Sequence, residues 1–363
     1  MRGADQNRKN VPKTGSAGRR LSIIAFFVHP IVVAVFSFLT YSCNMISKSR
    51  SGAGPPALLF VLLISINLTG CQNSQYSNPI AGARVSGTVF GGQQPVTGSS
   101  IQLYTVGNTG DASAATPLIS ATVTTSDGSG LINSNANAGN ANNSLPAGSF
   151  TITGDYTCPT SSSEVYLVGR GGNPGLAPGS NNSALTLMAA LGQCGNLSSS
   201  TFVSLNELTT VATIASLSNF MNSYSTVGSG SADSAQLQTA FLTVNEYTNI
   251  SNGTVPGPTL PTGYSASSTA IQTLGDIVAT CVNSAGGVAG DGSACGQLFT
   301  LATISGNSAP TDTVGAVLNI LKQPTVNVSQ IFALLPATPP FEPPFRAHLQ
   351  IGSSPFPPAP RLH

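Results

Sequence analysis

Charge and histidine are both scarce in this sequence, and each shortage limits the chemistry open to the protein. Only 7% of the 363 residues are charged, Trp is absent, and the three histidines are His29, His348 and His363. Because the chain between His29 and His348 contains no histidine, Ser-His and Cys-His nucleophile pairs are excluded from that part. The sequence also lacks GxSxG, Gly-Lys and GxGxxG, which excludes a nucleophile elbow, a P-loop and a dinucleotide-binding turn.

The few charges are unevenly distributed along the chain. Eight of the thirteen basic residues lie within the first fifty positions, whereas from Cys71 onward five basic residues are outnumbered by eleven acidic ones. A surface that binds nucleic acid needs clustered Lys and Arg to neutralise phosphates. The sequence therefore predicts no nucleic-acid partner.

Carboxylates are the remaining catalytic candidates. Glu207 with Glu246, or Asp276 with Asp312, could form a glycosidase pair, which requires two acids about 5–10 Å apart. A structural role is favoured for them, because Glu207 fits a capping box that begins at Ser204. Asp276 and Asp312 fall on a helix surface and at a helix start. The sequence therefore predicts no catalytic residue.

The apolar run from Ala57 to Leu68 follows a short positive segment that begins at Met45, and it ends in Leu68-Thr-Gly-Cys71. This arrangement resembles a bacterial lipoprotein signal with its lipobox. The resemblance implies cleavage before Cys71, diacylglyceryl attachment to its thiol and acylation of the new amino terminus, which together hold a protein stably on a bilayer. Gln72, rather than Asp, follows the cysteine, and by the usual sorting pattern this implies the outer membrane.

A second apolar stretch lies upstream, from Leu21 to Cys43, and is long enough to span a membrane. Two interpretations stay open. Residues 1–44 either include a transmembrane helix at 21–43 or precede a true start at Met45, from which 45–70 would form a complete signal peptide. The second interpretation is favoured. Residues 71–82 then form a polar tether.

The four cysteines downstream of Cys71 suit disulfide bonds. An even number in an exported chain suggests two bridges, and four cysteines allow three pairings. Proximity in the sequence favours Cys158–Cys194 and Cys281–Cys295, each stabilising by roughly 3 kcal/mol. Zinc is the competing interpretation, but no C-x-x-C occurs and no histidine lies among these cysteines. No metal site and no cofactor is predicted.

Short segments with alternating apolar residues predict an antiparallel β-sandwich over residues 83–170. Gly, Pro and Asp separate the five clearest segments, which are 83–90, 100–105, 118–124, 149–153 and 164–168. Period-two alternation of this kind is typical of half-buried strands, and several such strands in close succession are typical of a small sandwich.

Two stretches within this range carry a family resemblance. Gly87 to Leu103, with Pro95 and Gly98 in its turn, resembles the opening of carboxypeptidase-regulatory-like (prealbumin-like) domains. Pro146-Ala-Gly-Ser-Phe-Thr-Ile152 is similar to a later strand of those domains. The resemblance implies a prealbumin-like sandwich. The Asn- and Gly-rich insertion at 126–144 departs from a compact version of that domain and is expected to form a long surface loop.

Beyond a Gly-, Pro- and Asn-rich linker at 171–182, the periodicity becomes helical, and 183–335 is predicted to form a small all-α domain. A helix should follow Ser204, and Pro and capping residues mark further helices near 233–250, 267–284, 293–305, 312–323 and 327–335. The motif Asn206-Glu-Leu-Thr-Thr210 is echoed from Asn245 to Thr248, but two copies are too few for a repeat protein. Residues 336–363 hold nine prolines and are expected to be a disordered, extended spacer.

The sequence thus predicts an α+β protein with an N-terminal antiparallel β-sandwich, a small all-α domain and disordered terminal segments. The lipobox, the sandwich and the Asn-Glu-x-Thr-Thr region resemble the front part of uncharacterised bacterial envelope lipoproteins that often continue into NHL-type β-propellers. The expected function is structural, adhesive or binding display at the outer membrane, without catalysis. The expected partners are membrane lipid through Cys71 and an envelope glycan or protein. A carboxylate-based carbohydrate-active enzyme and a truncated remnant of a larger propeller lipoprotein are the alternatives.

Overall fold

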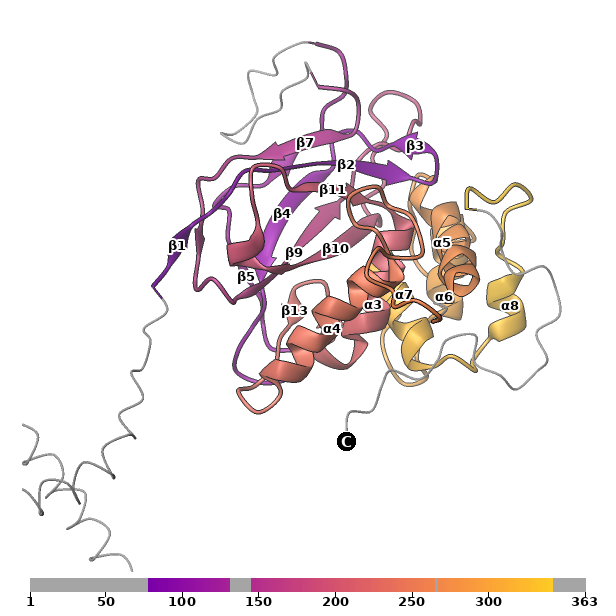
Figure 1. Cartoon of the computed structure of the whole chain (residues 1–363). Helices are drawn as coiled ribbons and strands as arrows, with labels where there is room; N and C mark the ends of the chain where they lie inside the picture. The colour runs from indigo at the N-terminus through magenta and orange to yellow at the C-terminus, as the bar shows by residue number, and fades with distance from the viewer. Residues whose placement is uncertain (1–77, 131–144, 265–266, 342–363) are drawn as a thin grey trace, which may run out of the picture. The chain divides into compact units, whose positions relative to one another are not determined.

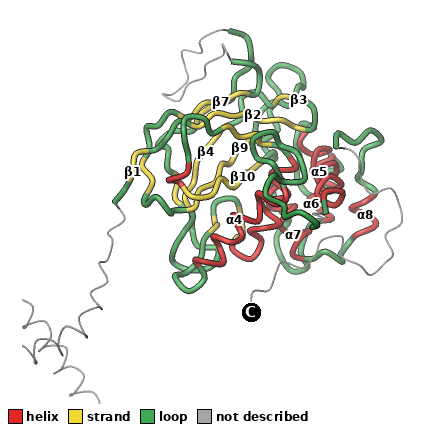
Figure 2. The backbone as a smooth tube through the Cα atoms, in the orientation of Figure 1, coloured by secondary structure: helices red, strands yellow, loops and turns green. Residues whose placement is uncertain are grey.

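The computed structural model describes residues 78–130, 145–264 and 267–341 (Figure 1). Strands come first along these residues and most helices follow, which confirms the predicted α+β class. Figure 2 shows the strands gathered on one side and the helices on the other. The upstream segment, the signal sequence with Cys71, and the Pro-rich tail beyond Phe341 lie outside the described residues.

Two sheets form the β-rich half of the fold. The first contains four strands, β7 (Ser149–Ile152), β2 (Val85–Gly91), β11 (Phe202–Leu205) and β3 (Gln94–Pro95). The second contains five, β10 (Thr186–Gln193), β9 (Glu164–Arg170), β4 (Ser100–Thr105), β5 (Thr116–Pro117) and β6 (Val123–Thr124). Neighbouring strands are antiparallel except β11, which pairs parallel to β2.

Two short strand pairs complete the β structure. β1 (Ile80–Ala81) pairs with β8 (Thr157–Cys158), and β12 (Met221–Ser223) pairs with β13 (Thr226–Val227). The turn of the β12–β13 hairpin covers part of β9, where the Tyr166 hydroxyl donates a hydrogen bond of 2.8 Å to the Tyr224 carbonyl. This cover explains why β9 is buried from Glu164 to Gly169, on both of its faces.

The alternation seen in the sequence matches the burial of the predicted strands. In β2 and β4 every second residue is buried, and Val85, Val89, Ile101 and Leu103 are fully enclosed in the core. Their neighbours on the other face are only partly covered. These strands therefore form as the period-two pattern predicts, because one face is removed from water and the other is not.

Among the residues that the structure describes, six α-helices accompany the sheets: α3 (Glu207–Leu217), α4 (Ser234–Tyr247), α5 (Ser268–Val282), α6 (Ala294–Leu301), α7 (Thr313–Lys322) and α8 (Val328–Phe332). Each lies where the sequence predicts a helix. Side-chain caps fix three of the starts: Asn206 caps α3, Ser293 accepts from the Gly296 N–H at 2.9 Å, and Asp312 accepts from the Gly315 N–H at 2.8 Å.

The range predicted to be all-helical, 183–335, also contains strands. It contains β10 and β11, which complete the two sheets, and the β12–β13 hairpin, and α3 packs on β10. Ala184 to Ala190 are all buried, so no polar alternation distinguishes this strand from a buried helix. One hydrophobic core runs through sheets and helices, and the described residues form a single compact body rather than two separate domains.

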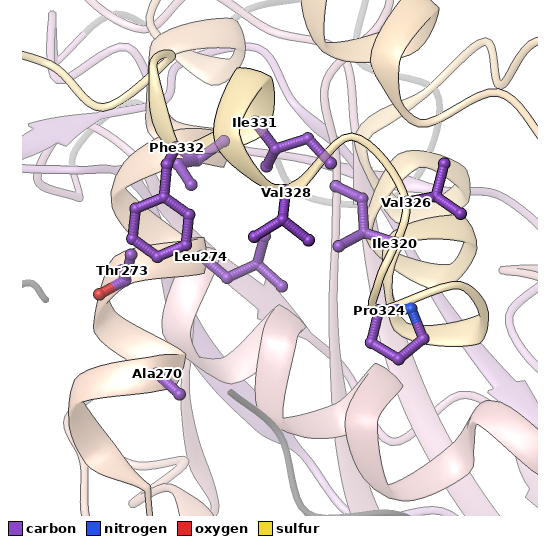
Figure 3. A pocket seen from close by; sticks show the side chains of 10 residues that line it. Ala270, Thr273, Leu274, Ile320, Pro324, Val326, Val328, Ile331 and Phe332 are labelled. Carbon is purple, nitrogen blue, oxygen red and sulfur yellow. The ribbon is translucent and has the colours of Figure 1, made fainter. Parts of the chain in front are cut away.

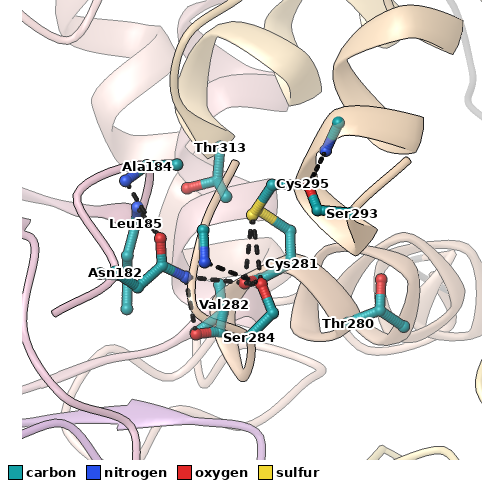
Figure 4. Close-up of a disulfide and its surroundings, with 12 residues drawn as sticks. Asn182, Ala184, Leu185, Thr280, Cys281, Val282, Ser284, Ser293, Cys295 and Thr313 are labelled. Atoms are coloured by element: carbon teal, nitrogen blue, oxygen red, sulfur yellow. Dashed lines mark hydrogen bonds between the residues drawn. A yellow bond between two sulfur atoms is a disulfide. The ribbon is translucent and has the colours of Figure 1, made fainter. Parts of the chain in front are cut away.

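Both cysteine pairings that sequence proximity favours are present in the structure. Cys158 is bonded to Cys194 and Cys281 to Cys295, with Cα separations of 6.0 Å and 4.3 Å. Figure 4 shows the second bridge beside Asn182, a buried residue of the predicted linker. The Asn182 amide donates to the carbonyls of Cys281 and Val282 at 2.7 Å and 3.1 Å. The predicted linker is therefore bonded firmly to the end of α5.

Threonine hydroxyls cover the free edge of β10. The outward N–H groups of Thr186, Met188 and Ala190 each donate to a threonine, at 3.0 Å, 3.0 Å and 3.1 Å. The acceptors are the hydroxyls of Thr313 at the start of α7 and of Thr210 and Thr213 on α3. The hydroxyls thus take the place of a neighbouring strand and satisfy an edge that would otherwise be open to pairing with another chain.

We expect the substitutions Thr210→Val and Thr213→Val to lower the free energy of unfolding by about 1–3 kcal/mol each. Valine preserves the shape of threonine but leaves a buried β10 N–H without an acceptor. Urea unfolding of the purified variants measures the effect. Thr239→Val and Thr243→Val on α4 are matched controls, because their hydroxyls bond only to helix carbonyls at exposed positions. If the control substitutions lowered the free energy of unfolding as much as Thr210→Val and Thr213→Val, the bonds to the β10 edge would not be the cause.

Candidate functional site

The Asn-Glu-x-Thr-Thr motif forms the start of α3 and is buried throughout. Asn206 is the N-cap, and its side chain accepts from the Thr209 N–H at 2.9 Å while the Thr209 hydroxyl accepts from the Asn206 N–H at 3.0 Å. The sequence predicts a capping box that starts at Ser204 and uses Glu207, and this is wrong by two residues, because the box consists of Asn206 and Thr209. Ser204 is still part of β11, paired with β2, so the helix cannot begin there.

Glu207 joins α3 to the end of β2 instead of capping the helix. Both of its carboxylate oxygens accept from the Gly92 N–H, at 2.9 Å and 3.0 Å, and its side chain is fully buried. Burial raises the pKa of Glu207 to about 8, with Gly92 opposing the rise and nearby Asp276 adding to it. Gly92 has a φ of +58°, a left-handed conformation that suits glycine at this turn.

Asp276, from the middle of α5, is the acidic residue that lies close enough to Glu207 to raise its pKa. The structure therefore brings together two of the four predicted carboxylates, in a pairing that the sequence does not predict. Glu246 lies near the end of α4, and Asp312 caps α7. Asp276 accepts from the Phe341 N–H at 2.9 Å, which fixes the last described residue against α5.

A polar cavity of about 450 Å³ is lined by Gly92 and Phe341, the two residues whose N–H groups these carboxylates accept from. Its walls come from β2, the β2–β3 turn, the start of α3, the turn at 252–255, α5 and the segment at 340–341. Gly92 and Phe341 line the cavity, whereas Glu207 and Asp276 do not. The two carboxylates thus hold its walls from behind and are not presented to its contents.

Amides, hydroxyls, aromatic rings and aliphatic side chains share the lining of the cavity. Four amide side chains take part, from Gln93, Asn206, Asn252 and Gln272, together with the rings of Phe90 and Phe341. Among the described residues, no acidic, basic or histidine side chain lines it. A charged ligand would enter such a site without a counter-charge, at a large desolvation cost. The cavity therefore suits a neutral ligand that is rich in hydroxyl or amide groups.

The walls of the cavity are fixed by hydrogen bonds between distant segments. The Gln93 amide donates to the Pro340 carbonyl at 2.9 Å, and the Asn206 amide donates to the Gly253 carbonyl at 2.8 Å. Local sequence patterns could not have revealed this site, because residues 93 and 340 come together only in the folded chain. The motif at 206–210 was the available signal, and it marks the wall of the cavity rather than its contents.

An apolar hollow between α5, α7 and α8 is a weaker candidate (Figure 3). Leu274, Ile320, Val328, Ile331 and Phe332 point into it, and its volume is about 40 Å³. Small-molecule sites usually enclose about 300–1,000 Å³. The hollow is therefore smaller than a usual small-molecule site, whereas the volume of the polar cavity falls within the range of such sites.

Within residues 78–130, 145–264 and 267–341, no three His, Cys, Asp or Glu side chains cluster as a metal site would require. No helix in the same ranges has the length and apolar character needed to cross a bilayer. The apolar stretch at 21–43 lies outside them.

In comparisons with known proteins, no family model, no curated protein and no solved structure matches the chain. The resemblances to prealbumin-like domains and to envelope lipoproteins therefore stay predictions from the sequence.

Proposed function

We propose that the protein is a lipid-anchored protein of the bacterial outer membrane that binds a neutral glycan of the envelope and performs no catalysis. The observation that carries the binding role is the uncharged cavity of about 450 Å³, lined by amides and two phenylalanine rings. Sugars offer hydroxyls to amide groups and an apolar ring face to aromatic side chains, so this lining suits them. The two disulfides agree with an oxidising compartment.

The anchor is proposed from the sequence. An apolar run that ends in Leu68-Thr-Gly-Cys71 precedes the described body by only a few residues. Acyl chains on Cys71 would therefore hold the sandwich close to the lipid surface, within reach of envelope glycans. Two or more chains are needed for stable attachment, since one chain binds only marginally.

Metabolic labelling with a clickable fatty acid tests the anchor. The full chain should incorporate the label and fractionate with the outer membrane, and Cys71→Ala should abolish both. Ser74→Ala is the matched control, since it changes the tether three residues beyond Cys71 and keeps the cysteine. Labelling that persists in Cys71→Ala, or that is absent from the unchanged chain, contradicts the anchor.

A carbohydrate-active enzyme is the second candidate function, and the paired carboxylates Glu207 and Asp276 are the observation in its favour. Both contact backbone N–H groups of the cavity wall and neither lines the cavity, which favours the binding role. The substitution Glu207→Gln distinguishes the enzyme from the binding protein. Hydrolysis and binding of neutral envelope polysaccharides are measured for the unchanged protein and for the variant. Loss of a measurable turnover supports the enzyme, and retained binding without any turnover supports the binding protein.

A further inference from the structure

A second hollow, of about 320 Å³, lies next to the polar cavity and is also uncharged among the described residues. Half of its lining is polar, from Ser200, Thr201, Asn245, Asn249 and Ser251, and the other half is apolar, from Leu191, Phe202, Val203, Ile250 and Pro258. Phe202 is 46% exposed, one of the few large apolar side chains open to solvent among the described residues. No charged side chain from the described residues contributes to this lining.

Strand β11 connects the two hollows. Phe202 and Ser204 lie two positions apart on β11, so they share one face at a spacing of about 6.6 Å. Phe202 lines the second hollow, whereas Ser204 and Asn206 line the polar cavity. The two hollows therefore adjoin along one strand, about one sugar ring apart.

A single tight turn separates the hollows. Asn249 and Thr254 close it, with the Asn249 N–H donating to the Thr254 carbonyl at 2.8 Å. Residues 249–251 line the second hollow and residues 252–254 line the polar cavity. The turn is held on β11 by a bond of 2.8 Å from the Ser204 N–H to the Ile250 carbonyl. It thus forms a fixed ridge with one uncharged hollow on either side.

We infer that the hollow at Phe202 is a second sugar subsite, so that the ligand is an elongated neutral oligosaccharide lying across the ridge at 249–254. This inference rests on the proposed glycan-binding function. The Phe202 ring offers an apolar platform for one sugar face, and the surrounding hydroxyls and amides meet its rim. A lone exposed phenylalanine is ordinary on a protein surface. Phe202 differs from an ordinary exposed phenylalanine because it lines an uncharged hollow that adjoins the polar cavity. Its ring is therefore positioned to contact a bound sugar.

The test is a calorimetric titration of the full chain with matched dimers and tetramers of neutral sugars, comprising N-acetylglucosamine, β-linked glucose, α-linked glucose and mannose. For the series that binds, the tetramer should bind about tenfold more tightly than the dimer, because its second half occupies an adjacent subsite at high effective concentration. Phe202→Ala should lower tetramer affinity to that of the dimer and leave dimer affinity unchanged. Gln93→Ala and Gln272→Ala, in the polar cavity, should weaken both ligands.

Leu242→Ala is the control, because Leu242 is 61% exposed on α4 and lines neither hollow. Dimer binding without a tetramer advantage, or a tetramer advantage that survives Phe202→Ala, would overturn the second subsite and leave the glycan-binding function standing. Failure of every sugar in the panel to bind would overturn both. Tighter binding of an uncharged Ser-Gly peptide of matched length would overturn both in favour of a peptide ligand.

Discussion

The free energy of unfolding should fall as the pH rises from about 5 to about 8, and Glu207→Gln should remove most of this fall. Burial raises the folded-state pKa of Glu207 to about 8, whereas in the unfolded chain it is near 4.5. Between these values the folded state keeps a proton that the unfolded state has released, so each rise in pH favours unfolding. One such group contributes a slope of up to about 1.4 kcal/mol per pH unit.

Glu164 adds to the same fall at lower pH, because burial at the start of β9 raises its pKa to about 7. Urea midpoints measured from pH 5 to pH 9 distinguish the two groups. Glu164→Gln should remove the part of the fall in unfolding free energy that ends near pH 7. Glu207→Gln should remove the part that continues to about pH 8. Glutamine keeps an oxygen acceptor for the Gly92 N–H, so folding should survive. If the free energy of unfolding of Glu207→Gln fell between pH 7 and pH 8 as steeply as that of the unchanged protein, Glu207 would not be the source of the pH dependence.

Removing the Cys158–Cys194 bridge by a double substitution to alanine should cost about 4 kcal/mol of unfolding free energy, and removing Cys281–Cys295 about 3 kcal/mol. The first bridge spans 36 residues and the second 14, and the longer loop loses more freedom in the unfolded chain. Both bridges lie in the core, so the alanines also lose packing around the sulfurs.

Urea unfolding under oxidising conditions measures both losses. Dithiothreitol should destabilise the unchanged protein by about as much as the two substitutions together, and it should have no effect on a variant that lacks all four cysteines. Equal stability with and without reductant would show that the bridges do not constrain the protein in solution.

Sequence patterns predict the elements of this fold best where one face meets water. The alternation in β2 and β4 marks both strands, because Val85, Val89, Ile101 and Leu103 are buried while their neighbours are partly exposed. The same reasoning fails at β10, where residues 186–190 are all buried and the edge is covered by threonines from α3 and α7. A hydroxyl that accepts from a sheet edge has no local signature in the sequence.

The candidate site was less predictable than the fold. The sequence offers four candidate carboxylates and pairs Glu207 with Glu246 and Asp276 with Asp312, whereas the observed approach of Glu207 to Asp276 depends on how α3 and α5 pack. Gln93, Asn252 and Gln272 meet only because β2, the turn at 252–255 and α5 converge in space. Isolated amides carry no pattern that distinguishes them from surface residues. The uncharged character of the site was nevertheless foreshadowed by the scarcity of charge in the whole sequence.

The mass of the intact protein, purified from its native membrane, tests the central claim of a lipid-anchored and disulfide-bridged binding protein most directly. We expect a chain that starts at Cys71 and carries a diacylglyceryl group and an additional acyl chain. Dithiothreitol should increase its mass by that of the hydrogen atoms added when the two disulfides are reduced. An unacylated chain that retains residues before Cys71, with four free thiols among the remaining cysteines, would contradict the account.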